Sequence, residues 1–267
     1  MATYTGKTIV VTGASSGIGR ALCLALAAQR PRLVLSGRDE ARLEQAAEAC
    51  RARGAEALAV RADVTVPAQC QLLISRAVER FGGVDVLVNN AGIGMIALFE
   101  EVRDLSVFES LMRVNYLGAV YATWYALPEL KRSRGQIVAI SSLSGLNGVP
   151  YRTGYSASKH AMFGFFDSLR IELRDSGISV TVVAPDFVVS EIQKRAFGPD
   201  GRPLGRSPLQ EDKIMTAERC AAEIIEAMEK RQRLWLGSLR GRVGRWVRLF
   251  APGLIDRIAL KAAREGK

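Results

Sequence analysis

The stretch TIVVTGASSGIG, residues 8–19, decides the fold. Its first part is a short, apolar, β-branched run, as expected of a strand buried on both faces of a parallel sheet. A glycine-rich turn follows, and residues 20–30 then show the apolar spacing of a helix. Glycine lets the backbone approach a ligand closely, and a helix start offers free N–H groups and a positive dipole. Strand, turn and helix in this order predict a cradle for nucleotide phosphates.

The rest of the chain repeats this alternation of strand and helix. Such alternation is typical of an α/β protein with a Rossmann-like, doubly wound parallel sheet and helices on both faces. A length of 267 residues suits one large domain. We expect about seven strands, at residues 8–11, 32–36, 57–61, 84–88, 136–141, 178–183 and 234–236, with helices at 39–53, 66–81, 114–130, 155–173 and 217–230 between them.

Composition excludes several classes of protein. An apolar content of 48% with 24% charged residues argues against global disorder. The four cysteines show no metal-binding spacing and one histidine accompanies them, so we expect no metal site and small buried thiols. Between residues 230 and 267, eleven Lys and Arg face two acidic residues, which is nine of the ten net positive charges. A nucleic-acid-binding surface would not be so confined, and we expect no nucleic-acid partner.

The chain start and one long, mainly apolar run both indicate where the protein is located. Residues 1–7 lack a basic region followed by an apolar one, which favours a cytoplasmic protein. The mainly apolar run at 114–130 contains Asn115, Thr123 and Pro128 and is shorter than a membrane-spanning helix. We interpret it as a core or interface helix.

The end of the second strand bears on cofactor choice. In dinucleotide-binding folds an acidic residue here accepts from the ribose 2′-hydroxyl, whereas an arginine accommodates a 2′-phosphate. This chain offers Gly37 and Arg38, although Asp39 follows at once. The pattern favours NADP(H) over NAD(H), and the alternative is a solvated arginine that opens the next helix.

Polar residues gather at several other strand ends. Asp63 and Val64 follow the third strand, Asn89 to Gly92 the fourth, and Ser142 the fifth. Tyr155 and Lys159 lie one helical turn apart at the start of the next helix. A cation there favours phenolate over phenol, so we expect Lys159 to lower the pKa of Tyr155. These groups should converge with the glycine turn on one edge of the sheet.

Over residues 5–237 the chain resembles the short-chain dehydrogenase/reductase family, specifically its single-domain, NADP-preferring members of the hydroxysteroid dehydrogenase and carbonyl reductase kind. The resemblance rests on TGASSGIG at 12–19, Asp63-Val64, NNAG at 89–92, Asn115, Ser142 and the Tyr155–Lys159 pair, in that order. It implies a homodimer or homotetramer, since the helices at 114–130 and 155–173 resemble those of the family's dimer contact.

The resemblance also implies roles for individual residues. Tyr155 would exchange a proton with the substrate oxygen, Ser142 would hydrogen-bond that oxygen, Lys159 would hold the nicotinamide ribose, and Asn115 would support a water in a proton relay. The residues that would bind the cofactor are Gly13, Ser15, Ser16, Gly17, Ile18, Gly19, Arg38, Asp63, Val64, Asn89, Ala91, Gly92, Tyr155, Lys159, Pro185, Val188 and Ser190.

Two residues depart from the family pattern after the sixth strand. Asp186 stands where glycine is usual, and Ser190 where threonine is usual. Aspartate does not take glycine's φ freely, which puts the local backbone and charge in question. The lid segment that follows, residues 186–215, is rich in Gly and Pro and lacks periodicity over much of its length. We expect it to become ordered when cofactor binds.

Residues 238–267, the tail, form a basic amphipathic extension beyond the catalytic domain at 1–237. Leu239, Val243, Trp246, Val247 and Phe250 share one helical face, and Arg240, Arg242, Arg245 and Arg248 occupy the other. A basic helix with a tryptophan fits an anionic membrane surface. The alternative is that its apolar face packs on the lid segment or on a neighbouring subunit.

We therefore expect an NADP(H)-dependent oxidoreductase that interconverts a ketone or aldehyde with an alcohol. The alternative is an NADP(H)-binding sensor with little or no turnover. Apolar residues near Tyr155 suggest a steroid-, lipid- or aromatic-ketone-like substrate, although they could equally belong to the core. The predicted pocket residues are Ile93, Met95, Leu143, Leu146, Val149, Tyr151 and Phe187.

Overall fold

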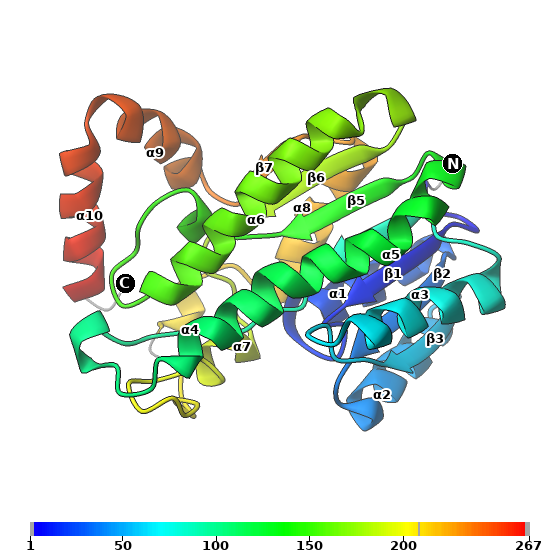
Figure 1. Cartoon of the computed structure of the whole chain (residues 1–267), viewed down its shortest axis with the longest axis horizontal. Coiled ribbons are helices and arrows are strands. Elements are labelled where there is room, and N and C mark those ends of the chain that lie inside the picture. The colour runs from blue at the N-terminus through cyan, green and yellow to red at the C-terminus, as the bar shows by residue number, and fades with distance from the viewer. Residues whose placement is uncertain (1–2, 208, 265–267) are drawn as a thin grey trace.

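A computed structural model describes residues 3–207 and 209–264, so residue 208 of the lid segment and residues 265–267 of the tail lie outside it. Seven strands form one sheet in the order β3-β2-β1-β4-β5-β6-β7 (Figure 1), and all neighbours are parallel. The strands are β1 (Thr8–Thr12), β2 (Arg32–Gly37), β3 (Glu56–Arg61), β4 (Val86–Asn89), β5 (Gln136–Ile140), β6 (Ser179–Ala184) and β7 (Leu234–Leu236). The predicted sheet is confirmed.

Helices cover both faces of this sheet, as the alternation predicts. On one face lie α1 (Gly17–Leu26), α2 (Glu40–Arg51) and α8 (Ala217–Glu229), and on the other, nearer the viewer in Figure 1, lie α3 (Pro67–Phe81), α5 (Gly118–Ser133) and α6 (Thr153–Glu172). Alternate residues of β1 point into the two resulting cores: Ile9 and Val11 into the first, Val10 into the second. Burial on both faces explains why the strand is apolar at every position.

The mainly apolar segment at 114–130 is not one regular helix. It begins inside a π-helical turn, Met112–Leu117, which joins α4 (Ser106–Leu111) to α5. The buried Asn115 lies in this turn. Its side chain accepts the Ile93 N–H at 2.8 Å and donates to the Ile93 carbonyl at 3.0 Å. Such turns are frequent at functional sites, and apolar spacing alone does not predict them.

The lid segment carries little regular structure of its own. It contains α7 (Glu191–Lys194), and isolated β-bridges join Val188 to Met215 and Met95 to Phe197. The tail forms two helices, α9 (Leu239–Phe250) and α10 (Pro252–Arg264), at one side of the molecule (Figure 1). Short 3₁₀ helices lie at Ala27–Gln29, Phe99–Glu101, Leu143–Gly145, Arg174–Ser176 and Glu211–Lys213.

Within the described ranges, no helix combines the length and the apolar character that crossing a bilayer requires. All four cysteines are free and buried, as predicted. The same ranges hold no group of three or more His, Cys, Asp or Glu side chains arranged to bind a metal ion.

Candidate active site

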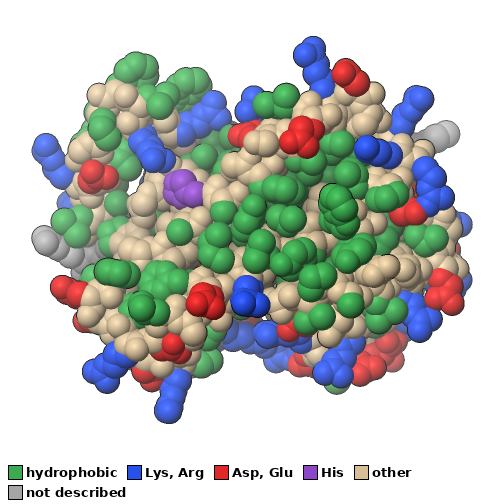
Figure 2. Space-filling view, viewed as in Figure 1, with side chains coloured by type: hydrophobic (Ala, Val, Ile, Leu, Met, Phe, Trp, Pro, Cys, Tyr) green, Lys and Arg blue, Asp and Glu red, His purple; other side chains and the backbone are tan. Residues whose placement is uncertain are grey.

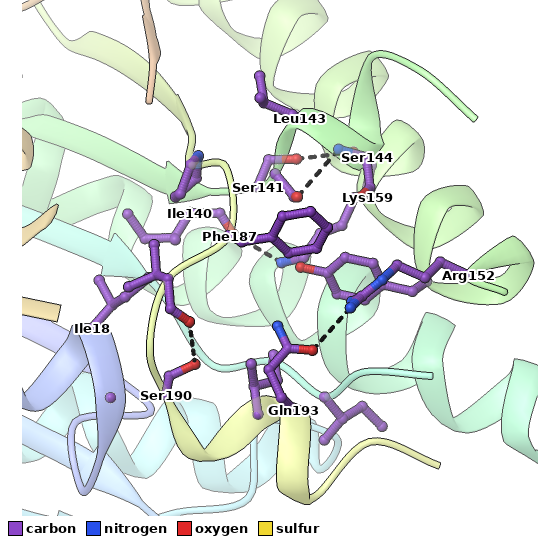
Figure 3. Close-up of a pocket in the computed structure, with 18 of the residues that line it drawn as sticks. Ile18, Ile140, Ser141, Leu143, Ser144, Arg152, Lys159, Phe187, Ser190 and Gln193 are labelled. Atoms are coloured by element: carbon purple, nitrogen blue, oxygen red, sulfur yellow. Dashed lines mark hydrogen bonds between the residues drawn. The ribbon is translucent and has the colours of Figure 1, made fainter. Parts of the chain in front are cut away.

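A cavity of about 710 Å³ opens at the carboxyl ends of the central strands (Figure 3). One wall is the glycine turn between β1 and α1, and the opposite wall is the start of α6. The turns after β4, β5 and β6 form its floor, and the lid segment and the tail contribute its outer rim. Ligands bind at this edge of open α/β sheets.

The glycine turn is shaped by close backbone contacts. Gly13 has a φ of +67°, and a Cβ there would lie 2.8 Å from the Cα of Ala91. A Cβ on Gly19 would lie 2.5 Å from the carbonyl oxygen of Gly13. The N-cap residue of α1, Ser16, makes no side-chain capping hydrogen bond, so the first N–H groups of this helix are left for a ligand. These features fit the pyrophosphate of a dinucleotide.

The cavity brings together most of the predicted cofactor residues, although two of them lie elsewhere. Gly19 is buried behind the turn and fixes the close approach of α1. Asn89 is the wrong residue: its side chain points into the core and donates to Thr123 Oγ1 at 2.9 Å. Successive strand residues face opposite sides, so the next residue, Asn90, lines the cavity. Its Nδ2 holds the turn through the carbonyls of Thr12 and Gly13.

Tyr155 and Ser142 form the reactive wall. Tyr155 lies in the first turn of α6 and is 8% exposed. Burial raises the pKa of its phenol, whereas the charge of Arg152 and the neighbouring Ser142 hydroxyl act to lower that pKa. Ser142 follows β5 in an extended conformation, and its Oγ accepts the N–H of Ser144 at 3.2 Å. Both side chains line the cavity.

Lys159 lies one turn further along α6 and is 3% exposed. Its Nζ donates to the carbonyl of Ile140 at 2.9 Å and lies 5.7 Å from the centre of the Tyr155 ring (Figure 3). Burial lowers the pKa of this amine to about 7. Arg152 is a second cation that acts to lower the pKa of the phenol, and the expectation that Lys159 lowers it stays a prediction.

Asn115 and Lys159 both lie next to Gly92. A Cβ on Gly92 would lie 3.2 Å from Asn115 Oδ1 and 3.7 Å from Lys159 Nζ, so a side chain there would press on both groups. Asn115 Nδ2 also donates to Ser158 Oγ at 2.9 Å, and that hydroxyl donates to the Tyr155 carbonyl at 2.8 Å. The π-turn is thereby tied to the first turns of α6.

On the substrate side, five predicted residues line the cavity: Ile93, Leu143, Val149, Tyr151 and Phe187. Met95 does not, because it is fully buried in a small core with Val107 and Leu111, and Ile96 lines the cavity in its place. Leu146 also lies outside the lining. The prediction for Met95 is wrong for the same reason as that for Asn89, because successive side chains of an extended segment point to opposite sides.

Asp186 is not strained, because its φ lies outside the positive range. Its carboxylate accepts from the Ser238 hydroxyl at 2.8 Å and from Arg240 Nη2 at 2.9 Å. These contacts fasten the start of α9 over the cavity, where Gly241 packs against Leu143. A Cβ on Gly241 would lie 2.5 Å from the Leu143 side chain, so the tail approaches closely. Part of the tail therefore packs on the catalytic domain through Gly241, whereas Val243, Trp246 and Phe250 of its apolar face are exposed.

Reasoning from sequence missed several lining residues. Arg152 lies directly before the first turn of α6 and reaches Gln193 of the lid segment (Figure 3). Its spacing of three residues from Tyr155 is the signal that could have identified it. The tail adds Arg240, Gly241, Gly244, Ile255, Ile258 and Ala259, for which no local motif exists.

Comparison with known proteins identifies the family. Residues 7–199 match the model of the short-chain dehydrogenases. An 11-beta-hydroxysteroid dehydrogenase A of Sesamum indicum is 36% identical over 257 residues, which cover 94% of this chain and 74% of the relative. A short-chain dehydrogenase/reductase from Burkholderia phymatum, solved in complex with NAD, superposes with a TM-score of 0.84 at 28% identity and covers 95% of this chain and 96% of that one.

A second solved structure is an alcohol dehydrogenase from Thermococcus sibiricus, complexed with 5-hydroxy-NADP. Its TM-score is 0.73 at 28% identity, over 86% of this chain and 95% of that one. The fold that these proteins share binds nicotinamide cofactors, and the glycine turn of this chain has the contacts that such a cofactor needs. The chain belongs to the short-chain dehydrogenase/reductase family of oxidoreductases and resembles its hydroxysteroid dehydrogenases.

Proposed function

We propose that the protein is an NADP(H)-dependent oxidoreductase that interconverts a ketone or aldehyde with the corresponding alcohol. One observation carries this proposal: Ser142, Tyr155 and Lys159 line the same cavity as the glycine turn. A nicotinamide cofactor held there supplies or accepts the hydride. The protein supplies the complementary proton and the shape of the site.

The preference for NADP(H) is argued from the end of β2. Arg38 lines the cavity and forms no ion pair with an acidic residue in the described part of the chain. Asp39, the nearest carboxylate, instead caps α2 by accepting the Arg42 N–H at 3.1 Å. A free arginine suits a 2′-phosphate, whereas a carboxylate engaged in capping is less available to a 2′-hydroxyl.

In the reducing direction, the Tyr155 hydroxyl donates its proton to the substrate carbonyl oxygen, and Ser142 donates a hydrogen bond to the same oxygen. Burial raises the pKa of Tyr155 and so keeps the phenol protonated until it is needed as an acid. Arg152 then stabilises the phenolate that the proton transfer leaves. In the oxidising direction the same phenolate accepts the alcohol proton.

The lining supports an apolar substrate body. Ile93, Leu143, Val149 and Phe187 face the cavity beside Tyr155, and the tail adds Ile255 and Ala259. Small-molecule sites combine such apolar walls with a few polar groups that fix orientation. Lipid-like, steroid-like and aromatic ketones fit this description.

The test is consumption of NADPH, followed by its absorbance, against a panel of apolar ketones and aldehydes. The matched control is Tyr155→Phe, which should bind NADPH and fail to oxidise it. If the wild-type protein binds NADPH and reduces none of a broad panel, the alternative of a non-catalytic cofactor sensor replaces this proposal.

We also propose that the outer face of the tail contacts anionic membrane surfaces. Phe250 is 86% exposed and Trp246 is 55% exposed, whereas Gly241 and the inner residues cover the cavity. Arg242 and Arg248 of the same helix are exposed as well. Apolar side chains beside several cations match a surface of anionic headgroups over an apolar interior, and each cation near that surface contributes about 1 kcal/mol.

Self-association is proposed through α5 and α6. Trp124 and Ile171 are 72% and 64% exposed on these helices. Figure 2 shows apolar side chains gathered over this face of the molecule. A contiguous apolar face of this kind marks an interface, and light scattering that finds a monomer at micromolar concentration would overturn this part of the proposal.

A further inference from the structure

Arg152 is a buried cation without an acidic partner. It is 7% exposed, and within residues 3–207 and 209–264 it forms no ion pair with any Asp or Glu. Buried charges in proteins are normally paired, because removing an ion from water is costly. An arginine in this state requires an explanation that its own protein neighbours do not provide.

Its place in the chain adds a second cost. Arg152 occupies the N-cap position of α6 and makes no side-chain capping bond there. Arginine is a poor N-cap residue, and a cation at the start of a helix faces the positive end of the helix dipole. Local structure therefore does not account for this residue type either.

The contacts of Arg152 are polar on one side and aromatic on another. Its Nη2 donates to Gln193 Oε1 at 2.9 Å, and its guanidinium carbon lies 5.3 Å from the Phe187 ring centre and 5.9 Å from that of Tyr155 (Figure 3). A guanidinium has five N–H donors, and Gln193 is the only hydrogen-bond acceptor that it reaches among the described residues. Most of its donors are left for a group in the cavity, which Arg152 lines.

Of the other arginines that line the cavity, Arg38 is unpaired within the described residues but exposed, and two have acidic partners. Arg240 pairs with Asp186, and Arg195 pairs with Glu191. Arg152 is thus the buried arginine beside Tyr155 whose charge is left unbalanced by the acidic residues that the structure describes, whereas Lys159, the other buried cation there, donates to the Ile140 carbonyl. One guanidinium carries one charge and presents a planar fork of donors, which matches a carboxylate better than a dianionic phosphate.

Resting on the proposed function, we propose that the substrate is an amphipathic oxo acid and that Arg152 binds its carboxylate while Tyr155 serves its ketone or aldehyde. The 5.9 Å between the guanidinium carbon and the Tyr155 ring centre places the two polar groups a few bonds apart. The apolar body extends past Leu143 and Val149. Arg152 is then a specificity residue and not a proton donor.

The experiment compares aryl oxo acids of increasing spacing between carbonyl and carboxylate, each with its own methyl ester, in NADPH-dependent reduction. For the wild type at the best spacing, we expect kcat/KM for the acid to exceed that for the ester by about 10- to 100-fold, the value of a hydrogen-bonded charge. Arg152→Gln should abolish this preference. Arg152→Lys should keep part of it, since lysine retains the charge without the fork.

Arg195→Gln is the matched control, because it removes a cavity arginine that already has an acidic partner, and it should keep the preference for the acid. If Arg152→Gln does not fold by circular dichroism, inhibition of wild-type ketone reduction by 3-phenylpropanoate is compared with inhibition by its amide. Stronger inhibition by the carboxylate supports the proposal.

Esters reduced as well as their acids across the series, or equal inhibition by carboxylate and amide, would overturn the assignment of Arg152 and leave the oxidoreductase proposal intact. If Arg195→Gln lowers the preference for the acid as much as Arg152→Gln does, the assignment of Arg152 is also overturned. The preference would then be a general effect of positive charge in the cavity. Binding of NADPH without reduction of any acid or ester would overturn the proposed function itself.

Discussion

Arg240 Nη2 donates to both carboxylate oxygens of Asp186, each at 2.9 Å. The two residues lie on different parts of the fold: Asp186 follows β6 at the cavity floor, and Arg240 lies in the first turn of α9. Because Ser238, the N-cap of α9, donates to the same carboxylate, one side chain fastens the start of α9. The tail and the segment expected to hold the nicotinamide are therefore mechanically connected.

Replacing Asp186 with Ala should release the tail. We expect trypsin to cut the arginines of α9 faster, and the free energy of unfolding to fall by about 1 kcal/mol, since hydrogen bonds to a charged group are lost. Arg240→Gln should give a smaller effect because Ser238 still binds Asp186. Unchanged cleavage in Asp186→Ala would show that apolar packing alone holds α9.

Tyr155→Phe should lower kcat by about 10²- to 10⁴-fold, because it removes the proton donor and leaves the ring in place. Binding of NADPH, measured by nicotinamide fluorescence, should change little. Ser142→Ala is the companion variant and should lower kcat by a smaller factor, because the proton donor remains. Turnover by Tyr155→Phe at the wild-type rate would refute the assigned role.

Arg38→Gln should weaken the binding of NADPH more than the binding of NADH. Loss of a charge-assisted contact with a 2′-phosphate predicts a rise of about 10- to 100-fold in KM for NADPH. The KM for NADH should stay nearly constant. Arg76→Gln, at an exposed position on α3, controls for the loss of one positive charge, and equal effects on both cofactors would contradict a role for Arg38 in discrimination.

Lys159 makes the stability of the protein depend on pH. Its pKa is about 7 in the folded protein and 10.5 ordinarily, so between these values the unfolded chain binds more protons than the folded one. Stability therefore rises with pH across this window, and the cost of the buried ammonium is fully present below pH 7.

Lys159→Met removes this cost. Urea unfolding should show the variant gaining most over the wild type at pH 7 and progressively less toward pH 9. Comparing the two proteins at each pH cancels the contributions of the buried cysteine thiols, whose pKa values are raised and which titrate in both proteins. A stability difference that is constant from pH 7 to 9 would contradict a lowered lysine pKa.

The tail should bind anionic vesicles through its outer face. Trp246→Ala combined with Phe250→Ala should reduce co-sedimentation with vesicles rich in phosphatidylserine, as should added salt, which screens the arginines. Trp124→Ala, which removes an exposed tryptophan from α5, is the control. Absence of binding at low salt would exclude the membrane contact and favour burial of this face by a second copy.

The features predicted correctly depend on neighbouring residues. The glycine turn after a buried strand, the alternation of strands and helices, and the Tyr155–Lys159 spacing are all local patterns. Asn89 and Met95 were placed wrongly because a shift of one residue reverses the side that a side chain faces. Asp186 and Arg240 are 54 residues apart, so no local pattern could pair them. The buried state of Arg152 depends on Phe187 and Gln193 of a distant segment.

The number of residues between the π-turn at Met112–Leu117 and the rest of α5 determines the geometry of the site. Asn115 holds Ile93 from within this turn, and Thr123, further along the continuous helix, holds Asn89. Each helical residue rotates the chain by roughly 100°. Deleting one residue between these two anchors would therefore turn one of them away from its partner, even if every remaining side chain were kept. This segment should accept exposed substitutions and reject insertions and deletions.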